Sequence, residues 1–494
     1  MWSIVNAWQR LPSQQRMRLA LGDMGVYLDA ASTTPLHPHA REVLLAAIDE
    51  GWADPARLYA DGRQARTLLD AARAVIAEVL GVRPPEVAFV ASGTHAVHTG
   101  LLGLASGRAR AGSRVVASAV EHSAVFAATQ WLASTGGAEP EIVPVDRQGL
   151  VDAAAFVAAA SRPGVAVTTL QSANHEVGTR QPVEQVGTAL HEIGVPLFVD
   201  AAQSLGRERV PAGWTGLAAS AHKFGGPAGV GLLAVAGSAR FHPPFPVDDR
   251  NLGGIRGVEV GMPPLPSIMA TAAALRAAVD ESVELGRRHR DWTARVRAAL
   301  ADVPDVDVLG AEDDRLPHLV TASVFGVDGE ALLGELDRLG FATNSGSSCT
   351  SSTLTPSHVL VAMGVLSQGN VRISMTRNTT EADIEALLTA FGPAVATVRE
   401  RHAGVTSHAA RPPVSGADSG PTVLDYRGRP CPAPVMALAA AVLAAEVGAV
   451  IAVEADDPAA PGDVAAWARM RGQELVSTEH LDDGAARITV RRVA

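Results

Sequence analysis

The chain has 494 residues, 47% of them hydrophobic, and a formal net charge of −11. This length supports two or three domains with hydrophobic cores, and the acidic balance disfavours nucleic acid as a direct partner. Two cysteines cannot build a disulfide framework, no uncharged apolar run reaches the length of a membrane span, and no Cys/His cluster has metal-ligand spacing. The composition predicts a cytoplasmic protein without a membrane partner or a metal site.

Residues 1–25 form an N-terminal extension that matches no later part of the chain. They lack the basic start and apolar core of a signal peptide. Met24 directly precedes the strand-like "VYLDA", so the extension is either a short added helix or sequence upstream of a start at Met24.

Residues 26–400 alternate short apolar runs, such as "SRVVASAV" and "VPLFVD", with Ala- and Leu-rich stretches of helical spacing, such as "TLLDAARAVIAEVL". This alternation predicts an α/β domain with a largely parallel sheet. Residues 401–421 are rich in Gly, Pro and Ser and are predicted to be a flexible linker. Residues 422–494 contain three strand-like runs and two helical ones, which predicts a small α+β sandwich.

Two sites in the large domain suggest pyridoxal phosphate (PLP) chemistry. Lys223 lies in the Gly- and Pro-containing turn "SAHKFGGP", and Asp200 ends the strand-like run before "AAQSLG". PLP requires a lysine to form a Schiff base and a carboxylate to keep its pyridine nitrogen protonated.

Other polar groups follow neighbouring strands and turns. The Gly-containing turn in "ASGTHAVH" precedes a helical stretch and can offer backbone N–H groups to a phosphate. His122 follows one strand, where an imidazole could stack on the PLP ring and move protons. Asn174 and His175 lie at another strand end.

The blocks "YLDAASTTPLHP", "SAVEHSAV", "SANHEVGTRQP", "FVDAAQSLG", "SAHKFGGPAGVG", "NSGSSCTSS", "SHVLVAMG" and "VRISMTRNTTEADI" occur in the order seen in cysteine desulfurases. These are PLP enzymes of the class V aminotransferase group with the type I fold. The resemblance covers roughly Val26–Arg399. It implies a large mixed, mostly parallel sheet, a smaller C-terminal subdomain, PLP as cofactor, L-cysteine as substrate and a homodimer.

The resemblance also implies a role for each matching residue. Lys223 would carry the cofactor, Asp200 would pair with the pyridine nitrogen, and His122 would stack on the ring and shuttle protons. Arg372 would clamp the substrate carboxylate, for which a guanidinium is suited. The remaining expected contacts to cofactor or substrate come from Gln203 near the ring hydroxyl, Ser220, His222, Thr94 and His95 at the phosphate, and Asn174 and His175.

Cys349, in the Gly- and Ser-rich "SGSSCTSS", is the expected sulfur acceptor on an exposed loop. The resemblance implies that its thiolate attacks the substrate sulfur, which leaves a persulfide on Cys349 and releases alanine. The "SGSSC" context resembles the desulfurases with a long catalytic loop.

Three positions depart from the family pattern. His95 replaces a phosphate-binding threonine, His175 replaces a second asparagine, and Met262 stands where a threonine often reaches the cofactor phosphate of the neighbouring subunit. Because of these changes, a non-enzymatic function remains an alternative hypothesis, in which the large domain is a non-catalytic scaffold for a sulfur carrier. Selenocysteine lyase and cysteine sulfinate desulfinase activities are also compatible with the site.

Near the C-terminus, "LDYRGRPCPAPVMAL" places Cys431 before a helical run. A cysteine at a helix N-terminus is expected to favour the thiolate. From about Thr422 to Ala494 the chain resembles TusA-like sulfur-carrier proteins, which implies that Cys431 accepts sulfur. The two cysteines then form a donor and an acceptor joined by a linker that keeps them at high effective concentration. A downstream sulfur-acceptor protein follows as a partner, and the final destination of the sulfur stays open.

Overall fold

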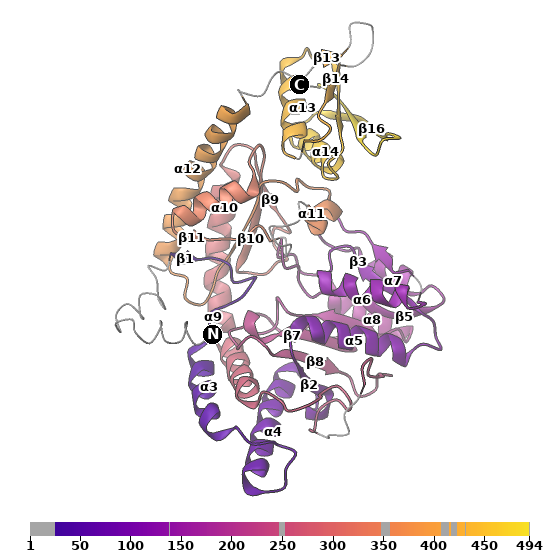
Figure 1. The fold of residues 1–494 in the computed structure, drawn as a ribbon, viewed down its shortest axis with the longest axis vertical. Coiled ribbons are helices and arrows are strands. Elements are labelled where there is room, and N and C mark those ends of the chain that lie inside the picture. The colour runs from indigo at the N-terminus through magenta and orange to yellow at the C-terminus, as the bar shows by residue number, and fades with distance from the viewer. Residues whose placement is uncertain are drawn as a thin grey trace, which may run out of the picture.

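The computed structural model of the chain describes residues 25–137, 139–246, 252–346, 356–406, 414–415, 422–429 and 431–493. The expected N-terminal extension lies outside these residues up to Met24, and Cys349 lies outside them too. Figure 1 shows a large α/β domain, a smaller subdomain above it, and a separate C-terminal domain at the far end.

The large domain is built on a seven-stranded sheet with the order β2-β8-β7-β6-β5-β3-β4. Every strand runs parallel to the others except β8, which is antiparallel to both of its neighbours. This confirms the predicted mostly parallel sheet, because the quoted apolar runs become its buried central strands. The strands are β2 (Val87–Val90), β3 (Arg114–Ser118), β4 (Glu141–Val143), β5 (Val165–Thr169), β6 (Leu197–Asp200), β7 (Gly216–Ser220) and β8 (Gly231–Val235).

Helices pack on this sheet and bury its apolar residues in two clusters. The long helix α9 packs against α3 and α4 and continues towards the smaller subdomain (Figure 1). The helices of this part are α3 (Pro38–Glu50), α4 (Ala60–Leu80), α5 (Gly93–Gly107), α6 (Ser123–Ser134), α7 (Ala153–Ala160), α8 (Val183–Glu192) and α9 (Leu265–Ala301), with 3-10 turns at Pro84–Glu86 and Ala221–Lys223.

The smaller subdomain combines late strands with the start of the described chain. Strand β1 (Val26–Tyr27) pairs in parallel with β11 (Phe341–Ala342), and β12-β10-β9 form an antiparallel sheet. This pairing brings the segment after β1 beside β12. The remaining elements are β9 (Val306–Leu309), β10 (Leu319–Val324), β12 (Asn370–Ser374), α10 (Gly329–Arg338), α11 (His358–Met363) and α12 (Glu381–Thr406).

The C-terminal domain is a five-stranded sheet with the order β13-β14-β15-β17-β16 and two helices, which confirms the predicted α+β class. Trp467 is fully buried in its core. Strand β16 was not predicted, because nearly all of its residues are exposed and it carries no apolar run. The elements are β13 (Val414–Ser415), β14 (Thr422–Asp425), α13 (Ala433–Ala444), β15 (Val450–Ala455), α14 (Ala460–Met470), β16 (Glu474–His480) and β17 (Ala486–Arg491).

Two parts of the segment 401–421, expected to be a linker, carry regular structure. Helix α12 continues beyond residue 400 to Thr406, and β13 pairs with β14. Among the described residues, no helix is long and apolar enough to cross a membrane.

Candidate functional site

A pocket lies where the carboxyl ends of the large sheet's strands face the smaller subdomain. In parallel α/β sheets this edge collects binding groups, because each strand leads there into a loop. Asp200 ends β6, Ser220 ends β7, and Asp200 is in register with Ala218 of β7. The lining residues with polar side chains are Ser32, Ser92, Thr94, His122, His175, Asp200, Ser220, His222, Lys223, Asn344 and Arg372.

Lys223 is the only lysine in the chain, although lysine and arginine together number 41. Its ammonium group donates a hydrogen bond to the Ala31 carbonyl oxygen at 3.0 Å. Burial lowers the Lys223 pKa to about 8, and the Arg372 charge lowers it further, whereas Asp200 raises it. Arginine cannot form a Schiff base, so a chain that otherwise uses arginine has kept one primary amine in this pocket. This signal was available in the sequence and strengthens the Lys223 assignment.

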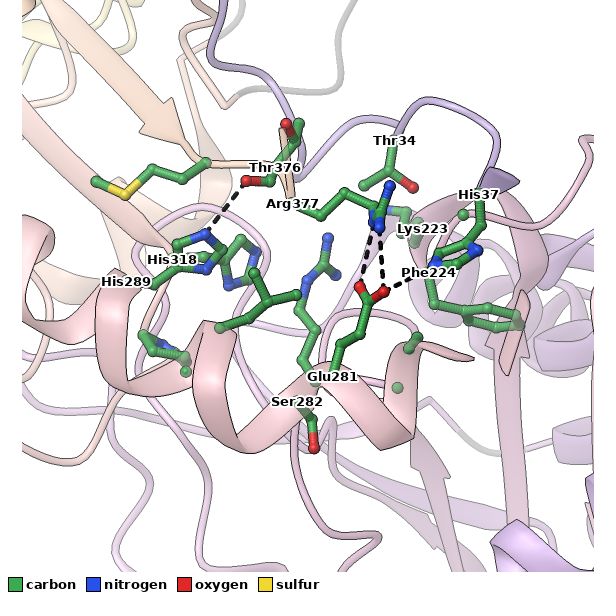
Figure 2. Close-up of a pocket in the computed structure, with 18 of the residues that line it drawn as sticks. Thr34, His37, Lys223, Phe224, Glu281, Ser282, His289, His318, Thr376 and Arg377 are labelled. Carbon is green, nitrogen blue, oxygen red and sulfur yellow. Dashed lines mark hydrogen bonds and ion pairs between the residues drawn. The ribbon is translucent and has the colours of Figure 1, made fainter. Parts of the chain in front are cut away.

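Lys223 also lines a second pocket, which opens against α9 (Figure 2). There Arg377 and His37 both contact the carboxylate of Glu281, at 3.0 Å and 3.3 Å. The pKa of Glu281 is lowered by Arg377, against the opposing effect of burial. This ion-pair cluster holds α9 against the loop that carries His37.

The N-terminus of α5 forms a cradle for an anion beside Ser220. Ser92 caps the helix by accepting the His95 N–H at 3.1 Å, and Thr94 lines the pocket. A Cβ atom at Gly93 would come within 2.8 Å of the Ser220 Cβ, so the close approach of backbone and strand requires glycine. Free N–H groups at a helix start, with hydroxyl side chains beside them, suit a phosphate.

Two expected contact residues, His95 and Asn174, are placed differently. The His95 ring packs edge-on against Phe245 at 5.8 Å and shares a neighbouring pocket with Met262. The Asn174 side chain accepts the Glu176 and Val177 N–H groups at 2.8 Å and donates to the Val120 carbonyl, so the turn uses its whole amide group. Neither side chain lines the pocket that holds Lys223.

Gln203 lies closer to that pocket. Its amide nitrogen donates to the Ala31 carbonyl at 2.9 Å, the oxygen that also accepts from Lys223. The amide oxygen of Gln203 is buried and has no hydrogen-bond partner among the described residues. An unpaired buried acceptor next to the lysine fits a hydroxyl donor from a bound group.

His122 and His175 meet at the wall of the pocket with ring centroids 5.2 Å apart. The His122 Nδ1 accepts the Ala124 N–H at 3.1 Å, so a neutral His122 carries its proton on Nε2. Burial, followed by the charges of His175 and Lys223, lowers the His122 pKa to about 3. His175 lies 3.5 Å from the Glu176 carboxylate, and burial also lowers its pKa. Both lowered pKa values favour neutral rings at pH 7.

The shifted pKa of His122 makes a stability effect measurable. An unfolded histidine titrates near pH 6.5, so below that pH the unfolded chain binds a proton that folded His122 excludes until about pH 3. We expect the free energy of unfolding of the wild type, minus that of His122→Gln, to fall as the pH is lowered from about 6.5. Urea unfolding at pH 7.5, 6.0 and 5.0 measures this difference, and a difference independent of pH would contradict the assignment.

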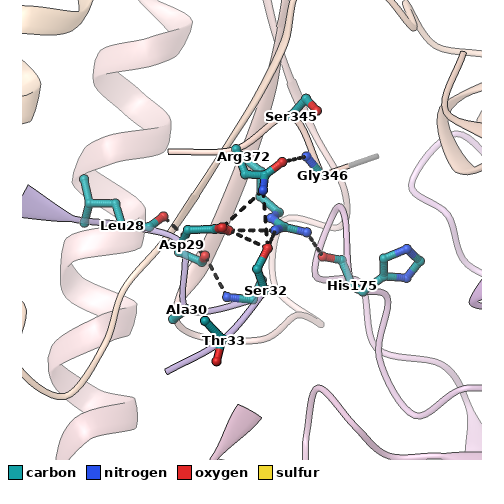
Figure 3. A network of polar contacts seen from close by, with 12 residues as sticks. Leu28, Asp29, Ala30, Ser32, Thr33, His175, Ser345, Gly346 and Arg372 are labelled. Atoms are coloured by element: carbon teal, nitrogen blue, oxygen red, sulfur yellow. Dashed lines mark hydrogen bonds and ion pairs between the residues drawn. The ribbon is translucent and has the colours of Figure 1, made fainter. Parts of the chain in front are cut away.

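Arg372 is held in a polar network that the sequence did not reveal (Figure 3). Its guanidinium donates to Asp29 and to Ser32 at 2.8 Å each, and to the His175 carbonyl at 2.9 Å. The Asn344 amide donates to the second Asp29 oxygen at 3.1 Å. The Arg372 Nε is buried without a partner among the described residues, so this N–H is available to a substrate carboxylate.

The roles of Asp29, Ser32 and Asn344 were missed, although each lies in a block that carries the family resemblance. Their signal is spatial, because the β1–β11 pairing and the bridge between Asp29 and Ser374 bring together residues that are more than 300 positions apart in the sequence.

The segment that carries Cys349 is flanked by residues attached to the site. Before it, the Gly346 N–H donates to the Asn344 side chain at 3.2 Å. After it, the Ser357 hydroxyl donates to Glu176 at 2.6 Å, and a ring nitrogen of His358 lies 2.9 Å from the Glu121 carbonyl. The first flank, Gly346, therefore lines the pocket, and the second is tied to Glu176, the neighbour of the lining residue His175.

Cys431 precedes α13, whose first residue is Ala433 and whose N-cap is Pro432. The backbone N–H of Cys431 donates to Asp457 at 2.6 Å. Burial raises the pKa of the Cys431 thiol, and the carboxylates of Asp457 and Asp463 raise it further. The expectation that the helix terminus favours the thiolate is therefore wrong for this arrangement, because burial and two carboxylates favour the neutral thiol. Among the residues that the structure describes, no group of three His, Cys, Asp or Glu side chains could hold a metal ion.

Comparison with known proteins agrees with this geometry. Residues 26–387 match the family model of class-V aminotransferases, and residues 422–492 match that of the sulfurtransferase TusA. The chain is 37% identical over 385 residues to an IscS-like cysteine desulfurase of Mycobacterium tuberculosis, covering 76% of this chain and 97% of that protein. It is 35% identical over 382 residues to a cysteine desulfurase of Cereibacter sphaeroides, covering 76% and 96%.

Among solved structures, a NifS-like protein superposes with a TM-score of 0.69 at 25% identity, covering 76% of this chain and all of the other. The matched part is the large domain with its smaller subdomain. The chain therefore belongs to the class-V aminotransferase family, among the cysteine desulfurases, and carries a TusA sulfurtransferase domain at its C-terminal end.

Proposed function

We propose that this protein is a PLP-dependent cysteine desulfurase that passes sulfur to its own carrier domain. L-Cysteine and the Cys349 thiol would give L-alanine and a persulfide on Cys349. The observation that carries the proposal is the pocket in which the single lysine of the chain lies with Asp200, beside an anion cradle and a guanidinium.

The side chains of this pocket fit PLP. The cradle at α5, with Ser220 and His222, suits its phosphate, and the unpaired Gln203 oxygen suits its ring hydroxyl. Burial raises the pKa of Asp200, so a cationic pyridine nitrogen beside it would be favourable for both groups. When bound, PLP supplies an electron sink for the bonds at the substrate Cα.

The protein's own groups then hold the substrate and move protons. Arg372 binds the substrate carboxylate through its free Nε, and Asp29 keeps the guanidinium in position. Lys223, in its neutral amine form, and the neutral imidazole of His122 line the same pocket and would accept and return protons there. Cys349, in the segment between Gly346 and Ser357, takes the sulfur.

Transfer to the carrier domain balances without an external oxidant or reductant. The Cys431 thiol gives up its proton as its sulfur attacks the outer sulfur of the Cys349 persulfide, the S–S bond breaks, and Cys349 leaves as a thiolate that takes up a proton. The products are free Cys349 and a Cys431 persulfide. The fusion keeps acceptor and donor at high effective concentration.

A cytoplasmic homodimer and a downstream sulfur-acceptor protein complete the proposal. Support for the dimer comes from the exposed apolar side chains of Val260 and Met262, each more than half exposed, near the segment through which the family contacts its second subunit. His95 lines the neighbouring pocket with Met262 and not the Lys223 pocket, where Thr94 and Ser220 remain available to a phosphate.

Substrate choice is tested by product release. The purified protein, supplied with PLP, is given L-cysteine, L-selenocysteine or L-cysteine sulfinate, and alanine is quantified. We expect alanine from L-cysteine to depend on Cys349, because only that reaction needs a thiol acceptor. Suppose instead that alanine is released from the other two substrates without need of Cys349, and little is released from L-cysteine. That result would support selenocysteine lyase or desulfinase activity. No alanine from any substrate would support the scaffold reading.

A further inference from the structure

The carrier domain lies against the smaller subdomain through helix α14 (Figure 1). The Asp463 Oδ1 accepts hydrogen bonds from the Ser367 N–H at 2.7 Å and from its hydroxyl at 2.9 Å. The rings of Trp467 and Phe325 stack with centroids 6.3 Å apart. Around them, Arg469 donates to the Gly364 carbonyl and Arg471 pairs with Asp305. We call Asp305, Phe325, Gly364 and Ser367 the docking surface.

This surface adjoins the candidate active site along the chain. Gly364 and Ser367 belong to the turn between α11 and β12. The other end of α11 begins at His358, next to Glu121, and β12 carries Arg372. A domain bound here touches the connection between two elements that line or support the pocket.

Two carboxylates of the carrier domain itself, Asp457 and Asp463, act on the Cys431 thiol, and in the docked position Asp463 is also covered by the docking surface at Ser367. Because water is excluded there, repulsion between Asp463 and an anion at Cys431 is screened less in the docked than in the undocked domain. Asp457 accepts the Cys431 N–H and a hydrogen bond from its thiol. Asp463 is 1% exposed, and its Oδ2 has no hydrogen-bond partner among the described residues. Both carboxylates act on the thiol, and the same Asp463 makes the central polar contact with the docking surface. A neutral thiol fits this environment, whereas an anion there would be repelled.

We propose that the docking surface binds the sulfur-free carrier domain and that a negative charge on the Cys431 side chain releases it. The proposal rests on the proposed function, in which Cys431 becomes a persulfide. A persulfide loses its proton more readily than a thiol, so loading converts a neutral group into an anion beside Asp457 and Asp463. Docking is then the resting position between cycles, and sulfur is received and delivered by the undocked domain.

The charge at position 431 can be varied without enzyme turnover by two substitutions in the full-length chain, Cys431→Asp and Cys431→Asn. The two new side chains have nearly the same shape, but only the first is an anion. Hydrogen exchange of the peptides around residues 364–367 and 460–471 reports docking, and small-angle X-ray scattering reports the overall extension. Phe325→Ser, which removes the stacked ring, supplies the undocked reference. We expect Cys431→Asn to match the wild type, and Cys431→Asp to shift the ratio of docked to undocked chains by about tenfold or more towards undocked.

A charge-rescue variant isolates the cause. Asn at position 463 keeps the acceptor oxygen for Ser367 and removes the charge, so Cys431→Asp/Asp463→Asn is expected to recover docking relative to Cys431→Asp alone. Equal exchange in the Asp and Asn variants at position 431, or no recovery in the double variant, would overturn the proposal.

If Cys431→Asp does not fold, alkylation of Cys431 in a Cys349→Ser chain replaces it. Iodoacetate adds an anionic group and iodoacetamide a neutral one of the same size. Release by the anionic adduct alone supports the proposal, and equal behaviour of both adducts contradicts it. These readouts need neither PLP nor alanine formation, so they fail independently of the desulfurase assignment.

Discussion

Replacing Lys223 with alanine is expected to lower alanine formation from L-cysteine by more than roughly 10³-fold, because the chain holds no second lysine to substitute for it. The amine lies in a buried setting that lowers its pKa to about 8, so a substantial neutral fraction is present near neutral pH. A neutral primary amine is the form that bonds to a carbonyl. Steady-state alanine assays at saturating PLP measure the loss.

Lys223→Arg is the matched control for charge. It retains a cation near Asp200 and Arg372 but has no primary amine, so it is expected to be as inactive as the alanine variant. Borohydride treatment followed by peptide mass spectrometry gives an independent readout, since only the peptide with Lys223 should gain the mass of reduced cofactor. Substantial activity in either variant, or cofactor fixed elsewhere, would contradict the role of Lys223.

Replacing Arg372 with glutamine is expected to lower both substrate affinity and stability. Loss of a charge-assisted hydrogen bond to the substrate carboxylate should raise the KM for L-cysteine about 10- to 100-fold. Removing one partner of the buried pair with Asp29 also leaves that carboxylate uncompensated, which costs about 3–5 kcal/mol of unfolding free energy. KM measurements and urea unfolding report the two effects separately.

Asp29→Asn separates the two roles. It removes the positioning partner but leaves the guanidinium, so it should destabilise the fold with a much smaller rise in KM. The double variant Arg372→Gln/Asp29→Asn should regain part of the lost stability, because no buried charge is left unpaired, and should keep the high KM. A KM that follows stability across all three variants would show that Arg372 acts only through folding.

The sequence predicted those parts of the fold that local patterns encode. The buried runs became β3, β5 and β6 of a mostly parallel sheet, and the two helical stretches near the C-terminus became α13 and α14. Strand β16 escaped prediction because its exposed residues show no apolar alternation, and β13 because pairing with β14 overrides a composition typical of a linker.

Site residues at strand ends were also within reach of the sequence, and Lys223, Asp200, His122 and Arg372 do line one pocket. Long-range contacts were not. The contact of Asp29 with Arg372 depends on pairing between β1 and β11, which are more than 300 residues apart. The side chain of Asn174 turned out to be used by its own turn, which a strand-end position cannot indicate.

The clearest difference between the expectation from the sequence and the structure concerns the electrostatic environment of Cys431. The run "RPCPAP" indicates a helix start, and a helix start alone favours a thiolate. Asp457 and Asp463 follow in the sequence after β15, and only the folded domain brings their carboxylates to the thiol. The protonation state of a cysteine therefore depends on tertiary contacts. Here those contacts reach the neighbouring domain, because Asp463 also accepts a hydrogen bond from Ser367 of the docking surface.

The most direct test of the proposed sulfur path is a persulfide map of the full-length protein after incubation with PLP and L-cysteine. Wild type, Cys349→Ser and Cys431→Ser are analysed side by side by mass spectrometry. We expect persulfide on both cysteines in the wild type, on Cys349 alone in Cys431→Ser, and on neither in Cys349→Ser. Persulfide on Cys431 in the Cys349→Ser variant, or on Cys431 only when a separate desulfurase is added, would contradict internal transfer from Cys349.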